Sequence, residues 1–223
     1  MRPAPSSPPP RARSVLCDTR GEEIASAITH GVGTAMAVGS MVYMLASAGG
    51  DPLRIIAALV FGTSLVLLYL ASTLYHTFSS PRLKGVLQTL DHACIYVLIA
   101  GSYTPLTLIS LRGPWGWSLL AVVWLLAIGG VLLKTVGRGR KDHWISTGLY
   151  IAMGWLAIIA IVPILKNLPL AGVAWLVAGG IFYSLGVVFF SWQRLRFNHA
   201  IWHLFVLAGS ACHVVTAACY ILP

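Results

Sequence analysis

Residues 53–77 read LRIIAALVFGTSLVLLYLASTLYHT, a stretch in which Arg54 is the only Lys, Arg, Asp or Glu. About 20 apolar residues in an α-helix are enough to span the hydrocarbon core of a bilayer. Inside lipid, the backbone N–H and C=O groups must be satisfied within the segment, and a helix does this. The stretch therefore predicts a transmembrane helix.

Six further apolar stretches of similar length lie outward from this one, separated by connectors that carry Gly, Pro, Asn and Ser. They are residues 24–48, 86–110, 115–136, 144–165, 170–192 and 199–222. The sequence lacks the alternating segments of about ten residues that are typical of a membrane β-barrel. We expect an all-α polytopic membrane protein, with seven transmembrane helices in residues 21–223.

The composition excludes other classes of protein. Of the 223 residues, 57% are hydrophobic and 9% are charged, whereas about 25% are charged in a typical soluble domain. Four cysteines are too few for a disulfide-stapled domain. The net charge is +9, but the Lys and Arg residues are scattered between the apolar stretches. We therefore expect no nucleic-acid partner.

The basic residues are distributed unevenly between the two ends of the predicted helices. Twelve of the fifteen Lys and Arg residues fall on the side of the N-terminus. The positive-inside rule therefore predicts a cytoplasmic N-terminus and, with seven spans, a C-terminus outside the cytoplasm. Residues 1–20 contain five prolines beside Ser and Arg, which predicts a disordered cytoplasmic tail.

Ionisable side chains inside a membrane are costly and usually functional. We place Asp91 inside a predicted helix and assign the other five acidic residues to the tail or the connectors. In the predicted topology, Asp91, His76, His199 and His203 all lie near the cytoplasmic ends of their spans. Three distant stretches of sequence are thus expected to meet at one depth.

Spacing indicates what the histidines could do. His199 and His203 are four residues apart, so their imidazoles share one helix face and can bind one metal. His76 would supply a third nitrogen, and three protein ligands plus water is the arrangement of catalytic zinc. Copper, nickel and iron also accept imidazole. The Ser72 hydroxyl points the same way as His76, and Asp91 could orient a ligand or hold the metal-bound water.

Each histidine taken alone also fits an ordinary packing or hydrogen-bonding role, and it is their combination with Asp91 that favours a metal site. His92 is about 100° around the helix from Asp91 and is left out of the ligand set. His213 lies about 15 Å deeper than His203. His213 is too far away to share the metal and could line a cavity with Ser210. For His30, lining the same cavity and packing between helices both remain open.

Four stretches of sequence carry a family resemblance: residues 22–31 (EEIASAITHG), 72–76 (STLYH), 90–105 (LDHACIYVLIAGSYTP) and 198–203 (NHAIWH). In this order they resemble the hemolysin III family of bacterial membrane proteins, which belongs with the progestin and adiponectin receptors. The resemblance covers about residues 22–222 and implies a multi-pass protein of the bacterial plasma membrane.

The resemblance also implies a site and a chemistry. Its metal would be Zn2+, with His76, His199 and His203 as ligands, Asp91 acting through the metal-bound water and Ser72 as the accompanying hydroxyl. Related alkaline ceramidases share this constellation and hydrolyse a lipid amide. A zinc-dependent hydrolase acting on a lipid-like amide is therefore the leading hypothesis, with membrane lipids as partners.

Two other functions stay open at this point. A cytolysin that permeabilises membranes is the first, although seven long spans and the lack of a secretion signal disfavour it. A sensor or receptor-like protein with structural zinc is the second, and it would need a fourth protein ligand such as Asp91. The substrate and the oligomeric state are not predicted by the sequence.

Overall fold

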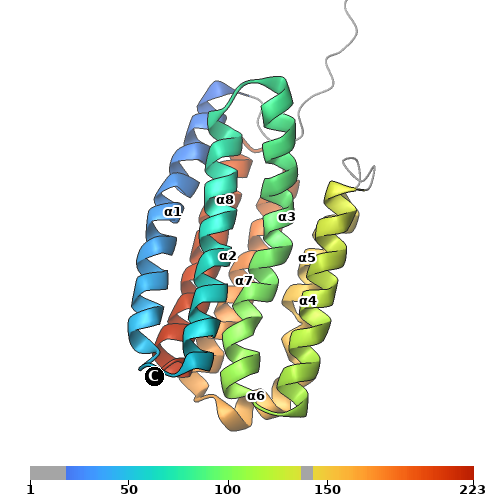
Figure 1. Cartoon of the computed structure of the whole chain (residues 1–223). Helices are drawn as coiled ribbons and strands as arrows, with labels where there is room; N and C mark the ends of the chain where they lie inside the picture. The colour runs from blue at the N-terminus through green and yellow to red at the C-terminus, as the bar shows by residue number, and fades with distance from the viewer. Residues whose placement is uncertain (1–18, 137–142) are drawn as a thin grey trace, which may run out of the picture.

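The computed structural model describes residues 19–136 and 143–223 and shows a bundle of long helices (Figure 1). Seven helical segments in this part of the chain are long and apolar enough to cross a membrane. The predicted all-α architecture with seven spans is confirmed. Apart from its last two residues, the predicted disordered tail lies outside the described residues.

Each of the seven spans coincides with a predicted stretch to within a few residues. The first four are α1 (Arg20–Ser47), α2 (Pro52–Thr77), α3 (Pro81–Pro105) with a π-helical continuation (Leu106–Ser110), and α4 (Pro114–Thr135). The fifth consists of α5 (His143–Gly154), a 3-10 turn (Leu156–Ala160) and α6 (Ile161–Asn167). The last two are α7 (Leu170–Ser191) and α8 (Asn198–Thr216), which continues as a π-helix (Ala217–Ile221).

Local sequence explains where several helices begin. Three of them start with a proline at the first position, where its missing N–H costs nothing. At α2, the Asp51 side chain also accepts hydrogen bonds from the N–H groups of Leu53 (2.8 Å) and Arg54 (3.1 Å). These bonds, that from Arg54 above all, hold the pKa of Asp51 below its usual value.

The start of α1 corrects one sequence assignment. Thr19 caps this helix and forms a capping box with Glu22. Glu22 and Glu23 therefore occupy the first turn of α1, where the helix dipole favours acidic side chains. Assigning them to a connector was wrong, because the cap starts the helix four residues before the apolar stretch.

The packing order of the spans positions the site. Helix α1 packs against α2 and α8, α2 against α3, α3 against α4, and α7 against α8. The starts of α1, α3 and α8 and the end of α2 meet at one end of the bundle, which we call the N-end (Figure 1). The last residue of the chain lies at the opposite end (Figure 1).

Small residues allow close contact between helices, and large apolar ones face outward. A Cβ added at Gly130 of α4 would collide with the buried ring of Tyr96 in α3, so these two helices touch at the glycine backbone. In contrast, Leu125 is 68% exposed. Outward apolar side chains of this kind suit a helix surface that faces lipid.

The fifth span is interrupted, although its sequence predicts a continuous helix. Around the break, the Tyr103 hydroxyl lies 2.9 Å from the carbonyls of Met153 and Gly154, to which it can donate, and accepts from the N–H of Ala157 (2.9 Å). Irregular backbone within a membrane is tolerated where protein satisfies its polar groups. Tyr103 supplies those partners from α3, far away in sequence.

Candidate metal centre

Three histidines from two helices meet at the N-end of the bundle. One ring nitrogen from each of His76, His199 and His203 lies within 4.8 Å of the other two. The Nε2 atoms of His199 and His203 are 3.1 Å apart, as expected for side chains one helical turn apart on one face of α8. All three side chains are buried. The cluster is therefore preformed by helix packing.

The cluster fits a metal of zinc-like size. With nitrogen ligands at 2.0–2.1 Å in tetrahedral geometry, ligand atoms lie about 3.4 Å from one another. The His199–His203 separation of 3.1 Å is close to this value, and side-chain adjustments of about 1 Å would bring in His76. Among the described residues, no carboxylate or thiol belongs to the cluster. The protein thus offers three nitrogen ligands, which is the donor set of an open zinc site.

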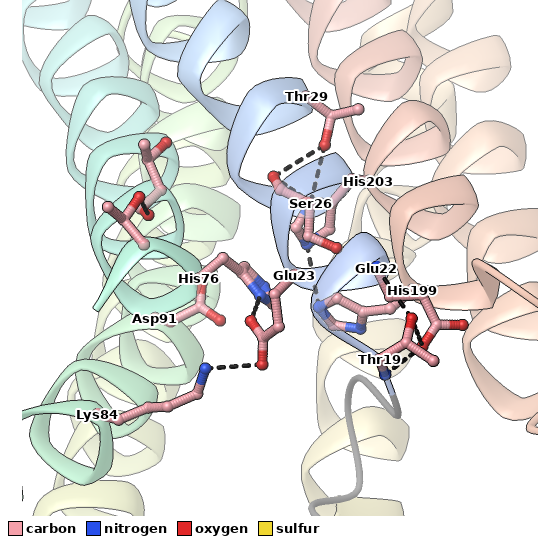
Figure 2. A network of polar contacts seen from close by, with 12 residues as sticks. Thr19, Glu22, Glu23, Ser26, Thr29, His76, Lys84, Asp91, His199 and His203 are labelled. Carbon is pink, nitrogen blue, oxygen red and sulfur yellow. Dashed lines mark hydrogen bonds and ion pairs between the residues drawn. The ribbon is translucent and has the colours of Figure 1, made fainter. Parts of the chain in front are cut away.

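A chain of charged residues holds His76 (Figure 2). Its Nδ1 lies 2.7 Å from Oε2 of Glu23, and the Lys84 ammonium donates to Oε1 of the same carboxylate at 2.7 Å. Since Nδ1 donates its proton to Glu23, Nε2 carries the lone pair that a metal needs. Metal-binding histidines usually have such a partner, which fixes the ring orientation and its basicity.

His203 is held from α1 in the same manner. Its Nδ1 lies 3.3 Å from the Ser26 carbonyl and 3.2 Å from the Thr29 hydroxyl. The Thr29 hydroxyl itself donates to the Ser26 carbonyl (2.9 Å), so it can accept a bond from the imidazole. The Nδ1–H tautomer again leaves Nε2 of His203 to act as the ligand atom.

Asp91 and Ser72 lie beside the histidines without joining them. Ser72 is one helical turn before His76, and its buried hydroxyl faces the Asp91 carboxylate. Asp91 is 4% exposed, and its Oδ2 is 4.0 Å from Nδ1 of His92, which donates instead to the Gln88 carbonyl (2.7 Å). A buried carboxylate thus lies at the same end of the bundle as the histidine cluster, on the helix that packs against α2.

A cavity of about 110 Å3 reaches Asp91. It runs between α3, α5, α7 and α8 and touches the break in the fifth span at Gly154 and Trp155. Most of the lining is apolar, and the polar exceptions are Asp91, His30, Ser102, Tyr103, Tyr150, Tyr183, Ser184 and His213. A space suited to a hydrocarbon chain therefore reaches Asp91 and His30, the residue that stacks on His203.

Comparison with known proteins identifies the family of this chain. The family described as "Haemolysin-III related" matches residues 19–214. The chain belongs to the hemolysin III family. It is 50% identical to "Hemolysin-3" of Bacillus cereus, over 91% of this chain and 93% of that protein. It is 45% identical to the "Hemolysin-3 homolog" of Bacillus subtilis (strain 168), over 85% and 90%. "Monocyte to macrophage differentiation factor" of Homo sapiens is 33% identical, over 71% and 67%.

Membership of the hemolysin III family confirms the resemblance that the four motifs predict. Together with the seven apolar helices, it indicates a multi-pass integral membrane protein. The structure brings together His76, His199 and His203 in the way that their spacing and the predicted topology require.

Sequence reasoning missed the residues that hold the histidines of the cluster in place through hydrogen bonds. Glu23 and Lys84 were not connected with His76, and Glu22 was not connected with α8. The Glu22 carboxylate accepts a hydrogen bond at 2.9 Å from the N–H of Phe197, a residue with φ of 59° just before α8. The available signal was the position of both acids directly before the first apolar stretch.

His30 has both of the roles that the sequence left open. Its ring stacks on that of His203, with centroids 3.5 Å apart and planes within 5°. It also lines the cavity, and neither of its ring nitrogens has a hydrogen-bond partner in the described structure. His30 therefore covers one face of His203 on the cavity side.

Proposed function

We propose that this protein is a zinc-dependent membrane hydrolase that cleaves a lipid-like amide at the N-end of the bundle. The observation that carries the proposal is the three-imidazole cluster, with Asp91 on the helix that packs against α2 and an apolar cavity that reaches Asp91 and His30, whose ring stacks on His203. Such a cluster leaves a coordination position for water or substrate. The 12-to-3 bias of basic residues supports placing this end in the cytoplasm.

The chain's own residues have distinct parts in this reaction. His76, His199 and His203 would hold the zinc ion, which when bound polarises a carbonyl and makes water acidic enough to attack near neutral pH. Asp91 would accept a proton from the attacking water and pass it to the amine nitrogen as the carbon–nitrogen bond breaks. The Ser72 hydroxyl would donate a hydrogen bond to the oxygen of the carbonyl under attack. The products are a fatty acid and an amine.

A sensor with structural zinc is less well supported. A closed structural site needs four protein ligands, and Asp91 would have to be the fourth. Its carboxylate lies outside the group of mutually close ligand atoms formed by the three histidines. The same geometry supports a role for Asp91 in proton transfer rather than in metal binding.

A hydrolysis assay with a matched pair of variants tests the proposal. Full-length protein in liposomes is given a fluorescent N-acyl lipid, and released fatty acid is measured for wild type, Asp91→Asn and Asp51→Asn. Asp91→Asn should retain zinc and lose about 10²–10⁴-fold in rate, because an amide cannot accept the proton. Asp51→Asn makes the same chemical change at the opposite end of the bundle and should keep full activity.

Equal rates in all three proteins, independent of zinc, would contradict the proposal.

The hydrolysis rate of Ser72→Ala should lie between those of wild type and Asp91→Asn, because this change removes one hydrogen bond to the developing charge and no proton acceptor. Lysis of erythrocytes by the same preparations tests the cytolysin hypothesis separately.

A further inference from the structure

A second polar point lies in the cavity, away from the histidine cluster. It consists of Tyr183 on α7 and His213 on α8, and both line the main cavity. His213 also lines a neighbouring cavity of about 60 Å3 that extends along the broken fifth span. His213 is ten residues beyond His203, which is about 15 Å along a helix axis. The proposed chemistry does not use either residue.

The hydrogen bonds of Ser210 determine what Tyr183 can offer. The Tyr69 hydroxyl donates to Oγ of Ser210 at 2.6 Å, and the Tyr183 hydroxyl lies 2.8 Å from the same atom. Ser210 is buried and has one hydroxyl proton. Either hydroxyl can be the donor in the bond with Tyr183, so Ser210 can satisfy that proton by donating to the Tyr183 oxygen. The proton of Tyr183 is then left to donate to a ligand in the cavity.

His213 offers a second hydrogen-bonding group beside it. Its ring stacks on Tyr183 with centroids 5.4 Å apart and planes within 16°. The ring nitrogens of His213 form no hydrogen bond with the described residues. A Cβ added at Gly179 would lie 2.7 Å from Nε2 of His213, so this glycine leaves room for the ring. An imidazole without partners inside a span is costly unless a ligand binds it.

We infer that Tyr183 and His213 bind a hydroxyl group carried by the hydrocarbon chain of the ligand. A hydroxyl can accept from Tyr183 and donate to His213, which a carbonyl cannot do. A charged group at this depth would be far more costly to bury. The inference rests on the proposed function for one point, which is that the acyl carbonyl lies at the histidine cluster.

The distance between the two polar points specifies the ligand further. Carbon–carbon bonds of about 1.5 Å advance an extended chain by about 1.25 Å per carbon, so about twelve carbons cover the 15 Å between the two points. The substrate class is therefore an acyl lipid with a hydroxyl near the twelfth carbon of its chain.

Binding of matched fatty acids tests this inference on the purified full chain in detergent. Octadecanoate, 12-hydroxyoctadecanoate and 2-hydroxyoctadecanoate compete with a fluorescent acyl probe, and the ratio of their affinities is measured for each protein. Wild type should prefer the 12-hydroxy acid over octadecanoate by about two- to tenfold, the value of one net hydrogen bond. The 2-hydroxy acid should show no such preference.

Variants assign the preference to the two residues. In His213→Leu the affinity ratio should fall to one, because the preference for the 12-hydroxy acid is lost. His213→Gln should keep part of the preference, because glutamine has a donor and an acceptor. Tyr183→Phe should reduce the ratio, whereas Tyr43→Phe removes a hydroxyl from an outward-facing residue and should leave it unchanged. Unfolding temperatures establish that each variant is folded.

A ratio of one in wild type, an equal preference for the 2-hydroxy acid, or a full preference in His213→Leu would overturn the inference. Because binding requires no turnover, these results leave the proposed hydrolysis untouched. Conversely, an absence of Asp91-dependent hydrolysis would overturn the proposed function and leave the hydroxyl contact standing.

Discussion

The Glu23 carboxylate accepts a 2.7 Å hydrogen bond from Nδ1 of His76, and this contact joins the first turn of α1 to the last turn of α2. Lys84 binds the other oxygen of the same carboxylate from α3. Three helices thus cooperate in orienting one histidine of the cluster. The contact selects the His76 tautomer with its lone pair on Nε2, which a metal requires.

Replacing Glu23 by Gln should weaken zinc binding by about 10–100-fold, the usual effect of losing such an outer partner. The amide keeps the size of the side chain but removes the negative charge that raises the basicity of the imidazole. Titration with a competing chelator measures the affinity. Lys84→Gln is the matched control and should have a smaller effect, because it leaves the carboxylate on His76. Unchanged zinc affinity in Glu23→Gln would show that this carboxylate does not support a metal ligand.

Adjacent glycines on α4 test the helix packing. Gly130→Ala should lower the unfolding temperature by about 2–10 °C, because the new methyl group meets the buried Tyr96 ring and overpacking costs about 1–3 kcal/mol. Gly129→Ala is the control, since a Cβ there has no atom within 4 Å. The two variants share the same gain in helix propensity, so the difference between their unfolding temperatures isolates the contact. Equal temperatures would contradict the α3–α4 packing.

Reporter fusions test the predicted topology. A reporter placed before Arg2 should lie in the cytoplasm and one placed after Pro223 should lie outside it, because of the bias in basic residues. Protease protection in spheroplasts measures both positions. Two termini on one side of the membrane would refute the seven-span arrangement, and an inverted result would move the histidine cluster to the outer face.

The fold and the meeting of the three histidines could be predicted from the sequence, whereas the contacts that hold these histidines in place could not. Apolar stretches of about 20 residues have one solution in lipid, so the seven spans were accessible from hydropathy. The i, i+4 spacing of His199 and His203 also has a direct structural meaning. The bond between Glu23 and His76 joins residues 53 positions apart, and it depends on where the Thr19 cap starts α1. The break at Gly154 likewise depends on Tyr103, a partner on another helix.

Metal analysis of purified full-length protein tests the central claim most directly. Wild type should contain about one zinc ion per chain, and Asp91→Asn should retain most of it, because the affinity resides in the three imidazoles. His92→Ala is a control histidine outside the cluster and should keep the metal. The double variant His76→Ala/His203→Ala should contain none. Undiminished zinc in that double variant would contradict the account.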